Sequence, residues 1–330
     1  MSAKNFQNEE PVFWKVDDIE VDATLIRPAG EGPFPAVIFV AGSGPTDRNW
    51  NTPLLPGTNG SGALLARELS EQGFITLRYD KRASGPHVLE NFNQMMGKIG
   101  LESHTAELAG GVSLLRGDKE VNPAQIFVLT NSEGCVHALN YQAQRENPPF
   151  AGMVLTSAFA RPTGVLARSQ MAAQFSAVPG GDAMLSAYDA AMKAFLAGRP
   201  VTVDENLPEG LRQVIQGITQ PANQPFSREL WVFNPTVKLA EMTVPILIVL
   251  GKKDIQVDWQ TDGSIFEAAA KGHDNVTIIY AENANHVMKL EPKPRAQLTA
   301  AEVMTTYSAD EVMLDPDPVG RIIAWLQAHL

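Results

Sequence analysis

Cysteine is nearly absent from this 330-residue sequence, since Cys135 is the only one. A single cysteine excludes an intramolecular disulfide and any metal site built from several thiolates. The first residues, MSAKNFQNEEPVFW, lack the apolar core of a signal peptide, so we expect a cytoplasmic protein. No stretch approaches the roughly 18 consecutive apolar residues of a transmembrane helix, and no membrane partner is predicted.

Positive charge is also scarce. The chain has 26 lysine and arginine residues against 37 aspartate and glutamate residues, which gives a net charge of -11. Nucleic acids and anionic membranes attract basic surfaces, so this balance argues against both and favours a neutral small molecule. The apolar content of 44% is that of an ordinary folded protein, and the sequence leaves the oligomeric state open.

Short apolar runs alternate with segments of helical period along most of the chain. The runs, each typical of a strand buried on both faces, span residues 35–40, 73–79, 124–130, 151–157, 244–251 and 275–281. The helical segments span residues 62–73, 104–117, 133–146 and 262–272. This alternation predicts an α/β protein with a mostly parallel central sheet and helices on both faces.

Two segments depart from the alternation. Residues 13–28 indicate an antiparallel pair of strands at the sheet edge. Residues 161–240 contain helical patterns without a strand signal, which predicts an inserted helical cap between a core of residues 1–160 and 241–330. Extra helical packing without a role at the site is the alternative for this insertion.

Ser132 lies where an apolar run passes directly into an alanine-rich helical pattern, in the stretch TNSEG. Ligands of parallel sheets bind outside the carboxyl ends of the strands, where such a serine would lie. The stretch resembles the G-x-S-x-G nucleophile elbow, with Gly134 in place and Thr130 at the position of the first glycine. A serine that only caps the helix is the alternative.

Two further residues match the partners that a nucleophilic serine needs. A serine hydroxyl reacts only when a base takes its proton and a carboxylate orients that base. Asp254 follows the strand-like run ending at 251, and His286 follows the run ending at 281. Asp258 is a second candidate for the carboxylate, although its position before a helical segment favours a cap.

The loop VAGSGPTDRNW, residues 40–50, follows the first buried run and carries two glycines. Its backbone N–H groups can approach a bound carbonyl, so we predict an oxyanion hole from the amides of Ser43 and Glu133. A phosphate-binding loop is the rival interpretation, but no G-x-G-x-x-G or lysine-bearing P-loop is present. Asp47 and Arg48 are predicted to form an ion pair that holds this loop.

Taken together, GSGPTDRN, LRYDKRASG, NSEG, GKKDIQV and NHV resemble, in order and approximate spacing, the α/β-hydrolase superfamily. The likeness is greatest to its esterase and dienelactone-hydrolase-like bacterial members with a helical cap. The resemblance implies hydrolysis of a carboxylic ester through an acyl-enzyme, with Ser132, His286 and Asp254 as the triad and without cofactor or metal. A short-peptide peptidase, an acyl thioesterase and a catalytically silent binding protein are the alternatives.

Three other residues could suggest chemistry but have simpler interpretations. Cys135 is predicted to be buried as a small apolar side chain. His137 lies on the helix after Ser132 and is predicted to pack or cap locally. His104 flanks the loop after LRYDKR and is expected to be a solvated loop residue, with a place in the pocket lining as the alternative.

Overall fold

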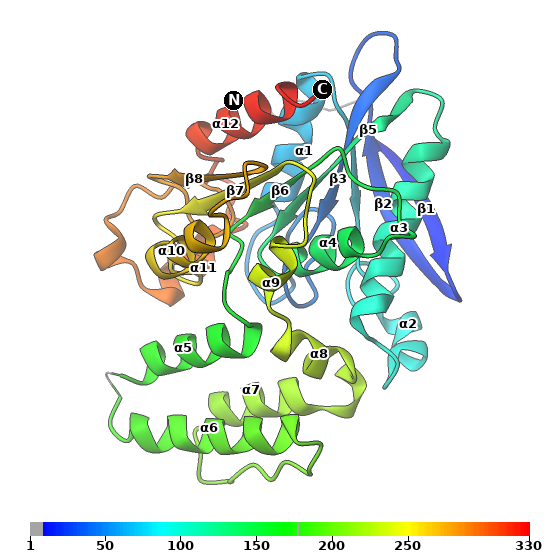
Figure 1. The fold of residues 1–330 in the computed structure, drawn as a ribbon. Helices are drawn as coiled ribbons and strands as arrows, with labels where there is room; N and C mark the ends of the chain where they lie inside the picture. The colour runs from blue at the N-terminus through cyan, green and yellow to red at the C-terminus, as the bar shows by residue number, and fades with distance from the viewer. Residues whose placement is uncertain (1–8, 177) are drawn as a thin grey trace.

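The computed structural model describes residues 9–176 and 178–330, which form one eight-stranded sheet in the order β1-β2-β4-β3-β5-β6-β7-β8 (Figure 1). The strands are β1 (Glu9–Val16), β2 (Ile19–Ile26), β3 (Phe34–Val40), β4 (Ile75–Tyr79), β5 (Val121–Asn131), β6 (Gly152–Thr156), β7 (Ile246–Gly251) and β8 (Val276–Ala281). Strands β3 to β8 are parallel to one another. Strand β1 pairs antiparallel with β2, and β2 pairs antiparallel with β4. The predicted α/β sheet is confirmed, and its antiparallel edge pair begins at residue 9 rather than 13.

The apolar runs form strands because both faces of the sheet are buried. Along β3, Val37 and Phe39 belong to one hydrophobic cluster, whereas Ala36, Ile38 and Val40 belong to the other. A strand covered on one side only would need polar residues at alternate positions.

Helices cover both faces of the sheet, as the sequence predicts. They are α1 (Ser61–Glu71) and α12 (Pro316–Gln327) on one face, and α3 (Leu101–Gly117), α4 (Gly134–Ala143) and α10 (Trp259–Ala269) on the other (Figure 1). Two short helices, α2 (Val88–Met95) and α11 (Ala300–Thr306), lie in connecting segments. No sequence prediction covers α2, α11 or α12. In the described part of the chain no helix is long and apolar enough to span a membrane.

The segment between β6 and β7 is helical, and its described residues include no strand. It contains α5 (Thr163–Phe175), α6 (Gly181–Leu196), α7 (Glu209–Thr219), α8 (Phe226–Val232) and α9 (Pro235–Leu239). Helices α5 to α8 lie apart from the sheet in Figure 1, and α6 and α7 share a small core that includes Tyr188, Met192 and Ile215. Helix α9, in contrast, packs against α4 and α10 of the main body. A separate cap spanning 161–240 stays a prediction.

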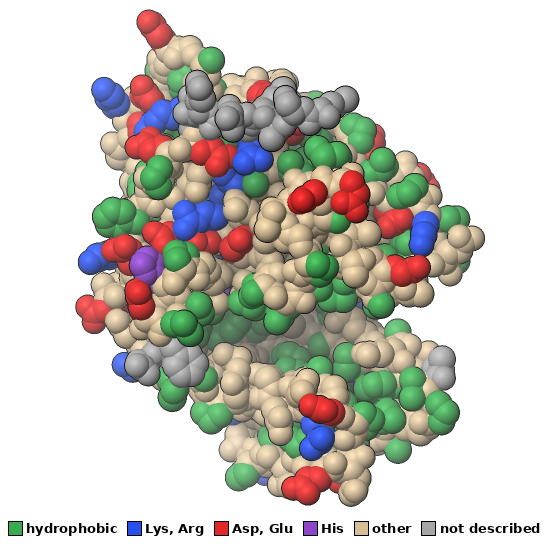
Figure 2. Space-filling model, turned by 180° about the vertical axis from the view of Figure 1, so that it is seen from behind, with side chains coloured by type: hydrophobic (Ala, Val, Ile, Leu, Met, Phe, Trp, Pro, Cys, Tyr) green, Lys and Arg blue, Asp and Glu red, His purple; other side chains and the backbone are tan. Residues whose placement is uncertain are grey.

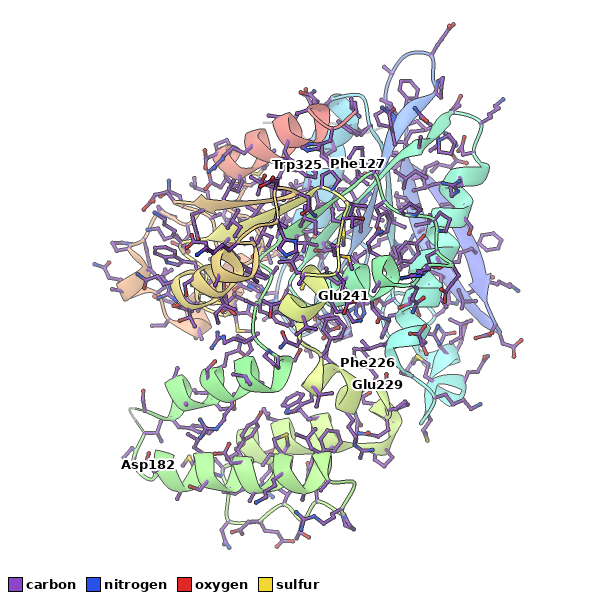
Figure 3. All side chains as sticks on the ribbon, viewed as in Figure 1. Phe127, Asp182, Phe226, Glu229, Glu241 and Trp325 are labelled. Atoms are coloured by element: carbon purple, nitrogen blue, oxygen red, sulfur yellow. The ribbon has the colours of Figure 1, made fainter. Side chains whose placement is uncertain are left out.

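An ion pair and hydrogen bonds of side chains tie the helical segment to the main body. Arg161 forms a bidentate ion pair with buried Asp262 on α10, and Gln170 on α5 donates to the carbonyl of Gln256 at 2.8 Å. At the other end, Glu229 on α8 accepts a 2.7 Å hydrogen bond from the amide of Leu101, the first residue of α3 (Figure 3). These contacts fix α5 against the loop that follows β7 and α8 against the start of α3.

Candidate active site

The turn between β5 and α4 holds Ser132 in a strained backbone conformation. Its φ is +51°, a region that non-glycine residues rarely adopt, and its amide donates to the carbonyl of Thr156 at 2.9 Å. A Cβ on Gly134 would lie 2.5 Å from the carbonyl oxygen of Val40, so only glycine fits there. Ser132 therefore occupies a tight strand-to-helix turn, which a plain helix cap does not require.

Thr130 replaces the first glycine of the motif because its side chain fits inside the sheet. Its hydroxyl donates to the carbonyl of Val154 at 3.4 Å, and Thr156 on β6 donates to the carbonyl of Thr130 at 2.6 Å. Both threonines are completely buried. The departure from the motif thus adds one hydrogen bond between β5 and β6, that of the Thr130 hydroxyl.

The loops after β7 and β8 bring Asp254 and His286 together. The carboxylate oxygen Oδ2 of Asp254 lies 2.8 Å from Nδ1 of His286, and both side chains are buried. The other oxygen accepts the amides of Gln256 and Val257 at 2.7 and 3.0 Å. An ionised carboxylate can only accept, so Nδ1 carries the hydrogen and Nε2 is the basic nitrogen of the ring.

Two side chains that sequence inspection did not select hold the histidine loop. The carbonyl of His286 accepts hydrogen bonds from Nδ2 of Asn131 at 2.9 Å and from the hydroxyl of Ser157 at 2.6 Å. Tyr307 stacks on the imidazole, with ring centroids 6.2 Å apart. Asn131 adjoins Ser132 in the chain, so one residue links the serine turn to the histidine loop.

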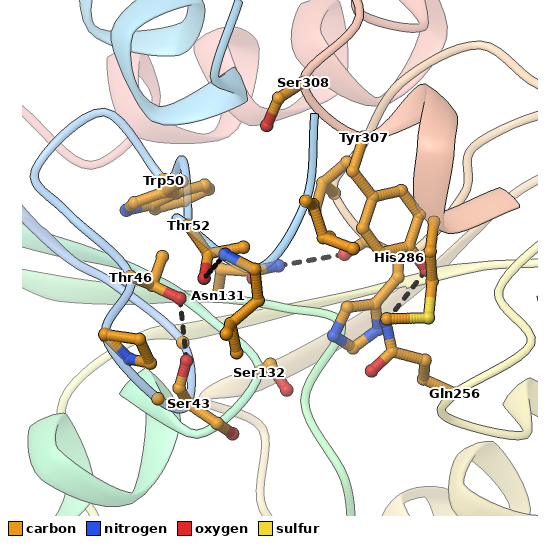
Figure 4. A pocket seen from close by; sticks show the side chains of 17 residues that line it. Ser43, Thr46, Trp50, Thr52, Asn131, Ser132, Gln256, His286, Tyr307 and Ser308 are labelled. Carbon is orange, nitrogen blue, oxygen red and sulfur yellow. Dashed lines mark hydrogen bonds between the residues drawn. The ribbon is translucent and has the colours of Figure 1, made fainter. Parts of the chain in front are cut away.

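Two cavities of about 280 and 260 Å³ share Ser43, Ser132, Gln256 and His286 in their walls. Figure 4 shows the larger of the two. The apolar walls of the larger are Trp50, Leu54, Leu55, Val287, Met304 and Tyr307. Those of the smaller, which lies under α5 and α8, are Phe159, Leu166, Ala167, Leu230, Trp231 and Val257. Figure 2 shows a hollow at the surface between the helical segment and the main body, with hydrophobic side chains in it.

The amides of Ser43 and Glu133 belong to residues that line the smaller cavity beside Ser132. Among the described residues, neither amide has a hydrogen-bond partner in the protein. Two free N–H groups next to the serine are what an oxyanion hole requires. The structure thus brings all five predicted site residues together, four at the cavity and Asp254 behind His286.

The ion pair predicted between Asp47 and Arg48 is wrong. Nε and Nη2 of Arg48 both donate to Oδ2 of Asp80, at 2.9 and 2.7 Å, while Asp47 accepts the amides of Asn49 and Asn51. Asp80 follows β4, the neighbour of β3 in the sheet, so the pair crosses between adjacent strand ends. The loop is held, but by a residue that follows the neighbouring strand β4.

Cys135 is buried, as predicted, and burial raises the pKa of its thiol to about 12, which keeps it protonated. In the described part of the chain one group of side chains, Glu20, Asp22 and His87, is close enough together to hold a metal ion. None of the three lines either cavity at Ser132.

The family model described as "Alpha/beta hydrolase family" matches residues 37–301, and this chain belongs to that family. The predicted family and the α/β-hydrolase fold are confirmed. A curated relative, Esterase EstD of Thermotoga maritima, is 26% identical over 312 residues, which cover 93% of this chain and 67% of that protein.

Solved structures of similar fold include an esterase from Pyrococcus furiosus, with a TM-score of 0.56, 17% identity and coverage of 99% of this chain and 93% of that one. A proline iminopeptidase from Mycobacterium smegmatis matches with a TM-score of 0.55 and 13% identity, over 97% and 98% of the two chains. At these identities the likeness concerns the fold alone, and the fold serves several acyl-transfer reactions.

Proposed function

We propose that the chain is a serine hydrolase that cleaves a carboxylic ester of a neutral small molecule. The observation that carries the proposal is the 2.8 Å hydrogen bond between Asp254 and His286, with His286 and Ser132 in the wall of the same cavity. The name of the Thermotoga relative, an esterase, agrees with this class of enzyme.

In the acylation step, Oγ of Ser132 attacks the carbonyl carbon of the ester while Nε2 of His286 takes the hydroxyl proton. The tetrahedral oxyanion accepts hydrogen bonds from the amides of Ser43 and Glu133, each worth roughly 100- to 1,000-fold in rate. Asp254 stabilises the imidazolium. When the intermediate collapses, His286 passes the proton to the departing alcohol.

Deacylation repeats these steps with water. His286 takes a proton from a water molecule, and the resulting hydroxide attacks the acyl carbon. The second tetrahedral intermediate uses the same two amides. Its collapse releases the acid, and the proton returns from His286 to Ser132. The cycle needs no redox change.

The cavity walls favour a neutral ester over the two alternative substrates. The described residues that line the larger cavity include no Asp, Glu, Lys or Arg, and those of the smaller include only Glu133. The carboxylate of Glu133 is engaged by His137 and Lys81. An aminopeptidase needs a free carboxylate for the substrate ammonium, and an acyl-CoA thioesterase needs cations for phosphates. Turnover of p-nitrophenyl esters, aminoacyl anilides and acyl-CoA thioesters tests the choice.

Helix α5 sets the length of the group that enters the smaller cavity. Ala167→Leu should reduce kcat/KM for long-chain p-nitrophenyl esters by tenfold or more relative to the acetate, because each excluded methylene costs roughly 10- to 200-fold. Ala173→Leu, at an exposed position of the same helix, is the control. An unchanged chain-length profile in Ala167→Leu would assign the helical segment to scaffolding. Rates measured across acyl lengths and alcohol lengths tell which group the cavity holds.

A further inference from the structure

Lys81 lies two residues after β4 and is 3% exposed. Its ammonium donates a short hydrogen bond to the carbonyl oxygen of Gly42 and lies 3.9 Å from Oε1 of Glu133. Gly42 directly precedes Ser43, and Glu133 is itself the second residue whose amide is a predicted oxyanion donor. Lys81 therefore contacts the chain at both predicted donors. A buried ammonium is costly to desolvate, so its position between them calls for an explanation.

The carbonyl of Gly42 and the amide of Ser43 belong to one peptide unit. A trans peptide is planar, and its C=O and N–H groups point in opposite directions. A cation fixed on the carbonyl side therefore holds the N–H side pointing away from Lys81. It also polarises the peptide, because hydrogen bonds in a chain strengthen one another where the dielectric is low.

Glu133 supplies the other amide and also binds Lys81 through its side chain. Its carboxylate accepts from Nε2 of His137 at 3.3 Å. Burial would raise the pKa of Glu133, but the hydrogen bond from His137 and the charge of Lys81 outweigh burial and lower it to about 2. The carboxylate is thus ionised at neutral pH, and an ion pair bridges the two halves of the oxyanion hole.

Lys81 and Glu133 line a separate cavity of about 240 Å³, together with His104 and Phe226. His104 on α3 and His137 on α4 lie with ring centroids 4.6 Å apart, and Phe226 of α8 packs against both (Figure 3). Glu107 on α3 binds His104 and Arg82. Lys81 itself has two partners in this cluster, the carbonyl of Gly42 and the carboxylate of Glu133, and two fixed partners are what a positioning role requires.

We propose that Lys81 is a positioning residue that orients and polarises the Gly42–Ser43 peptide and, through Glu133, fixes the second amide beside Ser132. This inference rests on the proposed serine-hydrolase function. It concerns the stabilisation of the transition state, because an oxyanion is present there and not in the bound ester.

Lys81→Met, which keeps the length of the side chain and removes its charge, tests the proposal. We expect kcat to fall by about 100-fold, the value of one oxyanion donor, with KM within threefold of wild type. A trifluoromethyl ketone, which forms a tetrahedral oxyanion on the serine, should lose affinity by a similar factor. A purely structural lysine would change thermal stability without this parallel loss.

Lys289→Met is the matched control, because Lys289 is also buried and also binds backbone carbonyls, those of Asn59 and Ala309. It should lower the melting temperature and leave the ratio of ketone affinity to substrate KM unchanged. A folded Lys81→Met with kcat within threefold of wild type, or with reduced kcat and full ketone affinity, overturns the proposal.

Should Lys81→Met fail to fold, Glu133→Gln gives the same information, because it removes the ion pair and keeps the backbone amide. We expect kcat and ketone affinity to fall together by about tenfold, and unchanged values overturn the proposal. Ser132→Ala distinguishes a failure of the proposed serine-hydrolase function from a failure of the role proposed for Lys81. If it retains turnover the proposed function fails, whereas an inactive Ser132→Ala beside a fully active Lys81→Met refutes only the role of Lys81.

Discussion

Ser132→Ala should abolish ester hydrolysis and leave the fold intact. The methyl group cannot attack a carbonyl, and loss of the nucleophile in a comparable serine protease costs about a million-fold in kcat. Alanine has no atom beyond Cβ to clash at a φ of +51°, and the amide bond to Thr156 is kept. The measurements are kcat with p-nitrophenyl acetate and the thermal midpoint.

Ser43→Ala is the matched control for this variant, because Ser43 also lines both cavities. The proposed mechanism uses the amide of Ser43 and not its hydroxyl, so the alanine variant should keep kcat within a few-fold of wild type. Turnover within tenfold of wild type in Ser132→Ala, or loss of activity in Ser43→Ala alone, would remove Ser132 from the role of nucleophile.

Asp254→Asn should lower kcat by about 10,000-fold with little change in KM. The amide of asparagine can offer an N–H group to the imidazole, which stabilises the tautomer that has no free base at Nε2; the analogous change in a serine protease has this size of effect. The amide oxygen can still accept from Gln256 and Val257, so the loop should keep its shape.

Asp258→Asn decides between the two candidate carboxylates. Asp258 caps α10 by accepting the amide of Thr261 at 2.8 Å, and it pairs with Arg295 at 2.8 Å. Asparagine also caps helices well, so the variant should lose at most about 1 kcal/mol of stability and keep its kcat. A large loss of kcat in Asp258→Asn beside an active Asp254→Asn would exchange their roles.

The features that sequence reasoning predicted correctly are local in the chain. The apolar runs of β3 and β7 are continuous because both faces are covered, and this is visible within a few residues. The need for glycine at position 134 can be predicted for the same reason, because the turn that requires it joins two elements that are adjacent in the chain. The order of Ser132, Asp254 and His286 follows from the resemblance to the family.

The features it missed depend on contacts between distant residues. Lys81 meets Gly42 across 39 positions, and Asn131 and Ser157 meet His286 across 155 and 129. No spacing in the sequence predicts such pairs, because they arise only when strand ends gather at one edge of the sheet. The register of parallel strands, and not the local pattern, selects these partners.

His104 shows how tertiary packing overrides an expectation drawn from polarity. The expected solvated loop residue lies on α3, is 4% exposed and contacts Glu107, His137 and Phe226. The helix starts at Leu101, before the apolar period becomes apparent, and α8 covers its first turn. For His137 the expected local packing is confirmed, since its side chain is buried and contacts Glu133 one turn away.

The most direct measurement of the central claim is fluorophosphonate labelling followed by mass mapping of the adduct. Only a serine activated by a base reacts with this reagent at an appreciable rate. We expect one adduct, on the peptide that contains Ser132, with slow labelling in His286→Ala and none in Ser132→Ala. An unlabelled native protein, or an adduct on another serine such as Ser43 or Ser157, would contradict the account.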